Sequence, residues 1–168
     1  MQLIEINKVR YRRHIKFVIA GCICGLFIGS LASSQILIAL FPDESGSHFQ
    51  WNLLGVVITG LTVAWVLNKY RKHDFMTEVV YVWELKQALN KINRKMRKLK
   101  TAAQGGNANA LLAMHYSYAG SRLLWQLDDN TLTMDQLAID QAELDNLAEK
   151  FNLTLNADNY DERTLTQF

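Results

Sequence analysis

Residues 17–41 read FVIAGCICGLFIGSLASSQILIALF, and this stretch decides the fold. It runs for 25 residues without a single Asp, Glu, Lys, Arg or His. A membrane-spanning helix needs about 20 predominantly apolar residues, so the run is long enough to cross a bilayer. It is also longer than the apolar core of a cleaved signal peptide, which is about 7–15 residues. The stretch therefore predicts an uncleaved transmembrane helix.

A second charge-free run covers residues 51–67 and predicts a second transmembrane helix. Its 17 residues rise about 26 Å as a helix, which is short but sufficient to span. The intervening segment, residues 42–50, is short and mostly polar, and it contains the one proline of the chain, Pro42. Residues 17–67 are therefore expected to form a transmembrane hairpin with an external turn at 42–50.

Small residues recur at every fourth position in both runs, which places them on one face of each helix. Such a face lets another helix approach closely. A tight turn would bring Gly29 level with Thr59 and Ser33 level with Gly55, so we expect the stripe to close the hairpin within one chain. In the inner half, Gly25 and Gly21 would instead face Val63 and Leu67. The residues expected to pack the helices are Gly21, Gly25, Gly29, Ser33, Gly55 and Thr59.

The basic residues indicate the orientation of the hairpin. Five Lys or Arg lie in the arm formed by residues 1–16, three follow the second run between positions 69 and 72, and the turn has none. Cytoplasmic loops carry the excess of Lys and Arg. Both termini are therefore expected in the cytoplasm, with the turn outside.

Three amphipathic helices are expected after the hairpin, at about 74–103, 108–127 and 134–151. The first carries a heptad seam, which suits either the core of a small bundle or a coiled coil between protomers. Its seam residues are Val82, Leu85, Leu89, Ile92, Met96 and Leu99. Short loops favour an antiparallel three-helix bundle, which makes residues 74–151 a cytoplasmic helical domain in an all-α protein. The polar residues 152–168 lack periodicity and are expected to form a flexible tail.

Capping residues support these helix starts. Asp74 is a plausible N-cap of the first helix, and Asn107 or Asn109 of the second. Thr133 and Gln136 have the spacing of a capping box before the third helix. Residues 68–76 leave open whether the second transmembrane helix runs on into the first cytoplasmic helix.

Charge is unevenly distributed along the chain. Residues 69–100 hold ten Lys or Arg against three acids, whereas residues 128–162 hold ten acids against one Lys. The two blocks can pair with each other, the basic first helix against the acidic third. The alternative is a surface for an anionic partner, either lipid or nucleic acid. That surface would comprise Lys91, Arg94, Lys95, Arg97, Lys98 and Lys100.

No catalytic, cofactor-binding or metal-binding residues are predicted. The four histidines are scattered and lack the spacing of metal ligands, and no Walker or dinucleotide-binding loop is present. His115, beside Tyr116, is the one histidine worth inspecting for a site, although no orienting carboxylate lies near it in sequence. We therefore expect a protein without enzymatic activity and without a cofactor.

Three stretches resemble a known family. They are residues 3–14 (LIEINKVRYRRH), residues 78–87 (EVVYVWELKQ) and residues 120–131 (GSRLLWQLDDNT). They are similar to domain-of-unknown-function family 3087, a family of small gammaproteobacterial membrane proteins, and the likeness covers about residues 2–155 in order. The resemblance implies a multi-pass protein of the bacterial inner membrane. It supplies no catalytic residue.

Three functions fit these features. The favoured one is a non-enzymatic inner-membrane protein whose cytoplasmic helical domain contacts a protein partner, a complex or a second copy of itself. The second is a membrane tether that binds anionic lipid or nucleic acid through the basic residues 86–100. The third is an accessory subunit of a transporter or another membrane complex. The sequence names no partner and no biological process.

Overall fold

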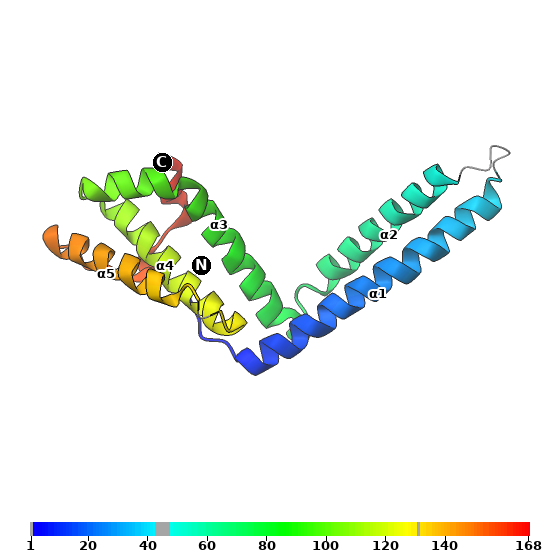
Figure 1. The fold of residues 1–168 in the computed structure, drawn as a ribbon, viewed down its shortest axis with the longest axis horizontal. Helices are drawn as coiled ribbons and strands as arrows, with labels where there is room; N and C mark the ends of the chain where they lie inside the picture. The colour runs from blue at the N-terminus through cyan, green and yellow to red at the C-terminus, as the bar shows by residue number, and fades with distance from the viewer. Residues whose placement is uncertain (1, 43–47, 131) are drawn as a thin grey trace. The chain divides into compact units, whose positions relative to one another are not determined.

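The computed structural model describes residues 2–42, 48–130 and 132–168, and it is all-helical. Helix accounts for 83% of the structure, and the described residues contain no strand. The elements follow one another along the chain as coloured in Figure 1. They are α1 (Lys8–Leu40), α2 (Phe49–Tyr70), η1 (Asp74–Met76), α3 (Thr77–Gln104), α4 (Ala108–Asp128), α5 (Met134–Lys150), η2 (Ala157–Asn159) and η3 (Glu162–Gln167), where η marks a 3₁₀-helix.

Two of these helices, α1 and α2, are long and apolar enough to cross a membrane. The first is longer than its charge-free run, because α1 begins at Lys8 and takes most of the basic arm into the helix. Its 33 residues rise about 50 Å. The second has 22 residues and rises about 33 Å, close to the hydrocarbon thickness of a bilayer.

The chain folds as two compact units. One comprises residues 9–80, and the other comprises residues 1–8 together with residues 81–168. The boundary between them falls inside α3, so the helix contributes its first turn to one unit and the remainder to the other.

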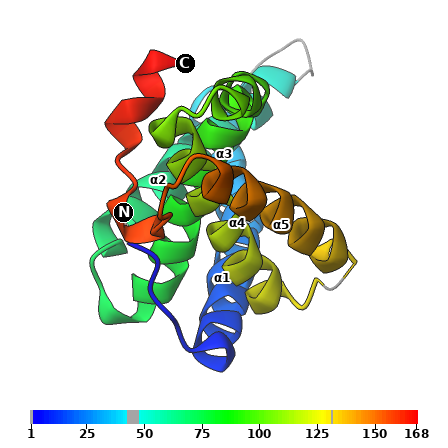
Figure 2. The same ribbon diagram turned by 90° about the vertical axis from the view of Figure 1, so that its left-hand side faces the viewer.

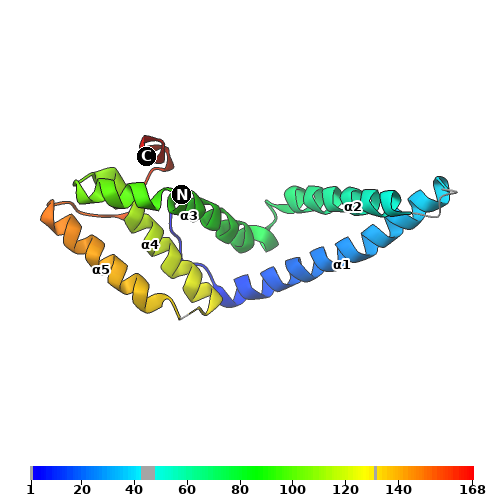
Figure 3. The same ribbon diagram turned by 45° about the horizontal axis from the view of Figure 1, so that its top comes forward.

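Within the first unit, α1 and α2 lie side by side and run in opposite directions (Figures 1 and 3). Polar side chains between them bond to the neighbouring helix. The hydroxyls of Ser33 and Thr59 lie 3.3 Å apart, and Ser34 Oγ donates to the carbonyl of Asn52 at 3.4 Å. Of the expected turn 42–50, residues 43–47 lie outside the described residues.

The two helices α2 and α3 are separate. The chain leaves the helix after Tyr70, and the 3₁₀-helix η1 comes before α3. The sequence suggests Asp74 as the N-cap, but His73 takes that role. The Nδ1 atom of His73 accepts a hydrogen bond from the amide of Phe75 at 3.2 Å. The reason is that Asp74 already lies inside η1, where its backbone is helical.

The second unit is organised around α4. This helix buries ten residues and is in contact with α5, η2 and η3. It also packs closely on α3, since a methyl group at Gly120 would lie only 3.0 Å from the Leu89 side chain. Figures 1 and 3 show α4 and α5 side by side and opposite in direction. The sequence pattern predicts one apolar face for α4, but contacts on several sides bury Leu111, Met114 and Tyr118 as well.

The predicted N-caps of α4 and α5 have different outcomes. Asn107 caps α4, since its side chain accepts from the amide of Ala110 at 3.0 Å. The capping box at α5 is wrong, because Thr133 makes no side-chain cap bond and has φ −105° and ψ 1°, outside the extended region that an N-cap adopts. Gln136 instead donates to Asp140 at 3.0 Å.

The C-terminal segment, residues 157–168, differs from the expected flexible tail. It contains η2 and η3, and its red ribbon is visible in Figure 2. Tyr160 stacks on Tyr116 of α4 with ring centroids 4.4 Å apart, and Leu165 is 5% exposed. Two large apolar side chains, spaced five residues apart without helical or strand periodicity, anchor the segment; this is why a search for periodicity misses it.

The first residues of the chain also have partners. The amide of Ile4 donates to the Tyr81 hydroxyl at 2.8 Å, and Lys8 forms an ion pair with Asp129. The basic arm 1–16 is thus divided: residues 2–7 lie against the unit that contains α4, and α1 takes up the rest.

Candidate functional site

The small residues of α1 and α2 meet in one half of the helix pair. A methyl group at Gly29 would lie 2.6 Å from Thr59 Cγ2, and one at Gly55 would collide with Ser34. The partner of Gly55 is therefore Ser34, while Ser33 bonds to Thr59. These positions permit the close approach of the two helices.

The other half of the pair is more open. A methyl group at Gly25 would meet Val63 Cγ2 at 3.7 Å, an ordinary van der Waals contact. At Gly21 it would meet no atom within 4 Å, whereas the expected register places Leu67 there. The helices separate towards their Lys8 and Tyr70 ends (Figure 3), and an apolar groove lies between them in this half.

The basic face of α3, defined as Lys91, Arg94, Lys95, Arg97, Lys98 and Lys100, is partly covered by the C-terminal segment. Lys91 pairs with Glu162 at 2.5 Å, and Lys95 Nζ donates to the carbonyl of Leu165 at 2.6 Å. Lys98 donates to the main-chain oxygen of Phe168. The other three residues of the face are exposed. Three of the six basic residues predicted to bind an anionic partner thus bond to the C-terminal segment of the same chain.

The basic block 69–100 pairs with the acidic block 128–162, as expected, but not through the acidic helix that the sequence suggests. Lys91 pairs with Glu162 and Lys86 pairs with Asp128, and both acids lie outside the acidic helix α5. The reason is the position of α4 and the C-terminal segment: Asp128 ends α4, and Glu162 begins η3.

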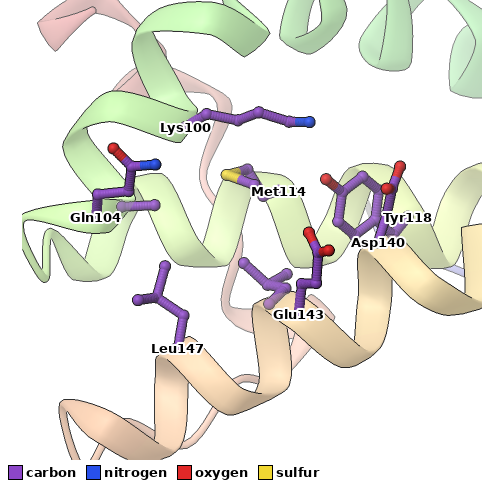
Figure 4. A pocket seen from close by; sticks show the side chains of 9 residues that line it. Lys100, Gln104, Met114, Tyr118, Asp140, Glu143 and Leu147 are labelled. Atoms are coloured by element: carbon purple, nitrogen blue, oxygen red, sulfur yellow. The ribbon is translucent and has the colours of Figure 1, made fainter.

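A groove lies where α3, α4 and α5 meet. In Figure 4, Lys100 and Gln104 come from α3, Asp140 and Glu143 from α5, and Met114 of α4 lies between them. The groove has a volume of about 110 Å³, well below the roughly 300–1,000 Å³ of small-molecule sites. Its lining also includes Ala103, Tyr118, Leu144 and Leu147.

The described ranges offer no group of side chains that could bind a metal ion. Residues 2–42, 48–130 and 132–168 contain no cluster of three or more His, Cys, Asp or Glu that would hold a metal ion. His115, the histidine singled out by sequence, lies on α4 with a buried Nδ1 that makes no hydrogen bond to the described residues.

A buried polar cluster that the sequence does not reveal joins α1 to the start of α3. Glu78 is 8% exposed, and its carboxylate lies 2.9 Å from Arg10 Nε and 3.5 Å from His14 Nδ1. The imidazole of His14 stacks on Phe75 at 4.1 Å. Arg10 and His14 are four residues apart, so one helix face presents both to Glu78. The partner lies 64 residues from His14 along the chain, beyond the range of any sequence periodicity.

Tyr116 and Tyr160, which stack on each other, are both buried. Neither the Tyr116 nor the Tyr160 hydroxyl has a hydrogen-bond partner among the described residues. Burial, followed by the nearby charges of Tyr81 and Glu162, raises the pKa of Tyr116 to about 12. Burial also raises the pKa of Tyr160, and Glu162 adds to that effect. Both phenols therefore stay protonated to a higher pH than that of an exposed tyrosine.

These features define a class: an all-helical protein with two helices that are long and apolar enough to span a membrane, and a separate unit of packed helices. The chain belongs to the family described as "Protein of unknown function (DUF3087)", whose model matches residues 1–165. No curated protein and no solved structure matches the chain. Family membership thus agrees with the resemblance seen in the sequence, and it assigns no activity.

Proposed function

We propose that the chain is a non-enzymatic integral membrane protein of the bacterial inner membrane. In this proposal α1 and α2 form a transmembrane hairpin, which anchors a cytoplasmic helical domain built from α3, α4 and α5. The domain contacts a protein partner or serves as a subunit of a membrane complex. The observation that carries the proposal is the exposure of large apolar side chains along both candidate spans.

Those apolar side chains argue for lipid as the solvent of α1 and α2. They include Phe17, Ile23, Phe27, Ile28, Leu31, Ile36, Leu53, Val56, Leu61 and Trp65, all of them about half exposed or more. A soluble protein rarely leaves such a surface facing water. The few polar side chains at the centre of the pair, such as Ser33 and Thr59, bond across to the neighbouring helix, as polar groups in hydrocarbon need to do.

The charge pattern supports the topology. Lys and Arg cluster at the Lys8 end of α1 and around Tyr70 at the end of α2, and residues 42–50 contain neither. By the positive-inside rule both ends then lie in the cytoplasm. The compact unit that begins at residue 81 follows the second cytoplasmic end and would lie on the same side.

The helical domain offers surfaces for a protein partner. Trp83 on α3 and Ile139 on α5 are each about half exposed, and α5 presents the acids Asp135, Asp145 and Glu149 to solvent. Exposed aromatic and apolar residues are enriched in protein interfaces.

Purification tests this proposal. Membranes are washed with alkaline carbonate, and the full-length protein is then extracted in mild detergent and analysed by mass spectrometry. We expect the protein to stay in the carbonate-washed membrane and to co-purify with a defined partner or as a defined oligomer. Release by carbonate would reject the membrane proposal. A protein that stays in the membrane but is purely monomeric and partner-free would reject the role in a complex.

A second function, a tether for anionic lipid or nucleic acid, is favoured by one observation. Arg94, Arg97 and Lys100 on the basic face of α3 are exposed. The C-terminal segment engages the other three residues of that face, so a full anionic surface requires its displacement. Because of this requirement, we favour the tether less than the role in a protein complex.

A further inference from the structure

The apolar groove between α1 and α2, here called the inner groove, is a feature of the candidate spans that nothing above explains. It has a volume of about 370 Å³, which falls within the range of about 300–1,000 Å³ typical of small-molecule sites. Its lining residues are Phe17, Val18, Gly21, Cys22, Gly25, Thr62, Val63, Val66 and Leu67.

The groove exists because small residues on α1 meet branched residues on α2. Glycine at position 21 leaves open space, and Gly25 contacts only the tip of Val63. On the Leu40 side, Thr59 fills the space beside Gly29, and there the helices touch. The lining of the groove is mainly apolar, so an apolar molecule is the occupant that suits it.

The charges at one end of the groove indicate which apolar molecule fits. Arg13 precedes Phe17 by four residues, and Lys69 follows Val66 by three, so helical spacing places both on the groove face of their helices. Both side chains are exposed, and Lys69 Nζ lies over the Trp65 ring at 5.0 Å. Helical spacing thus predicts two cations at one end of the apolar groove, an arrangement that complements an amphiphile with a negative headgroup.

We propose that the inner groove binds one anionic phospholipid. One acyl chain lies along Gly21 and Gly25, and the headgroup phosphate lies between Arg13 and Lys69. The inference rests on the proposed function, because it needs α1 and α2 to span a bilayer with these cations at its cytoplasmic face. A second copy of the chain fits less well, since a parallel neighbour would bring its own Arg13 and Lys69 against the same cations.

Native mass spectrometry of the full-length protein in mild detergent tests this site. Dioleoyl phosphatidylglycerol and dioleoyl phosphatidylcholine are added separately as probes with identical acyl chains. We expect a single tight adduct with the anionic lipid. Arg13→Gln with Lys69→Gln should weaken that adduct by about 30-fold, from two lost headgroup charges. Arg13→Lys with Lys69→Arg keeps both charges and should keep the adduct.

Filling the groove provides an independent test. Gly21→Leu adds its side chain to the open space and should abolish the single adduct. Gly60→Leu is the matched control: a methyl group there also meets no atom within 4 Å, but Gly60 does not line the groove, and the adduct should persist. Helical circular dichroism of each variant shows that the fold is retained.

Three results would overturn the inference: equal binding of the two lipids, an adduct that survives Gly21→Leu, or a lipid-free dimer that Gly21→Leu dissociates. The last would assign the groove to a second copy. Carbonate extraction of the same membranes separates these failures from failure of the proposed function. A protein that resists extraction but binds the lipids equally contradicts the lipid site alone.

Discussion

Thr59 shows how single residues determine the spacing of the two apolar helices. It fills the space beside Gly29 and lies within hydrogen-bonding distance of Ser33, so one side chain supplies both a van der Waals contact and a polar contact in the middle of α2. Four residues towards the Tyr70 end, Val63 barely reaches Gly25, and Gly21 has no neighbour within 4 Å. Glycines of the same stripe therefore differ in how closely they let the neighbouring helix approach.

Alanine substitutions distinguish these glycines. Gly29→Ala would place a methyl group 2.6 Å from Thr59 Cγ2, and we expect it to destabilise the protein by about 1–3 kcal/mol. Gly21→Ala enters open space and should be neutral or stabilising by up to about 1 kcal/mol, from helix propensity. Unfolding of the full-length protein by SDS in mixed micelles measures both. Equal effects of the two substitutions would contradict the structure of the pair.

Two single residues, Tyr116 and Tyr160, are also expected to make the stability of the protein depend on pH. The pKa of Tyr116 is raised to about 12 in the folded chain, while an unfolded tyrosine loses its proton near pH 10. The stability from the protonated pair is therefore complete below about pH 10 and is lost as the pH rises towards 12.

Thermal melts of the full-length protein in mild detergent between pH 8 and pH 11.5 test this dependence. We expect the free energy of unfolding to fall above pH 10 by about 1.4 kcal/mol per pH unit for each buried tyrosine. Tyr116→Phe with Tyr160→Phe should flatten this part of the profile. The account fails here if the wild type and the double variant lose stability in parallel.

At the scale of elements, the C-terminal segment is the part that most changes the interpretation of the surface. Its η3 helix lies against α3, buries Leu165, and engages three of the six residues of the basic face. The segment thus limits the area that an anionic partner can reach, and its attachment depends on a few apolar anchors.

Limited trypsin digestion tests that attachment, because Arg163 supplies a cleavage site within the segment. Leu165→Asp should release the segment and raise the rate of cleavage after Arg163 at least severalfold, since it buries a charge in an apolar site. Thr166→Asp makes the same charge change at an exposed neighbouring position and should cleave at the wild-type rate. Equal rates for both variants would mean that Leu165 does not anchor the segment.

Sequence patterns predict the helices themselves well, for a physical reason. Heptad spacing reflects burial along one helix, and of the six seam residues of α3 all but Met96 are buried. Features that depend on contacts between distant residues were not predictable in this way. Glu78 meets His14, and Tyr160 meets Tyr116, through the fold alone. The cap at Thr133 failed because its backbone conformation differs from that of an N-cap.

At the scale of the whole molecule, the orientation of every surface depends on the proposed membrane topology. In the proposed topology the two apolar helices α1 and α2, whose large side chains are exposed, cross a membrane, and the basic residues at the Lys8 end of α1 and the Tyr70 end of α2 keep those ends in the cytoplasm. The helical domain, the basic face and the lipid site all take their orientation from this topology.

The accessibility of single cysteines in intact spheroplasts tests this claim most directly. Cys22→Ala and Cys24→Ala remove the native thiols, and Gly46→Cys or Gln167→Cys then supplies one thiol in the turn or near the C-terminal end. We predict that a membrane-impermeant maleimide labels position 46 in intact spheroplasts and position 167 only after lysis. Labelling of position 167 in intact spheroplasts, or of position 46 only after lysis, would contradict the account.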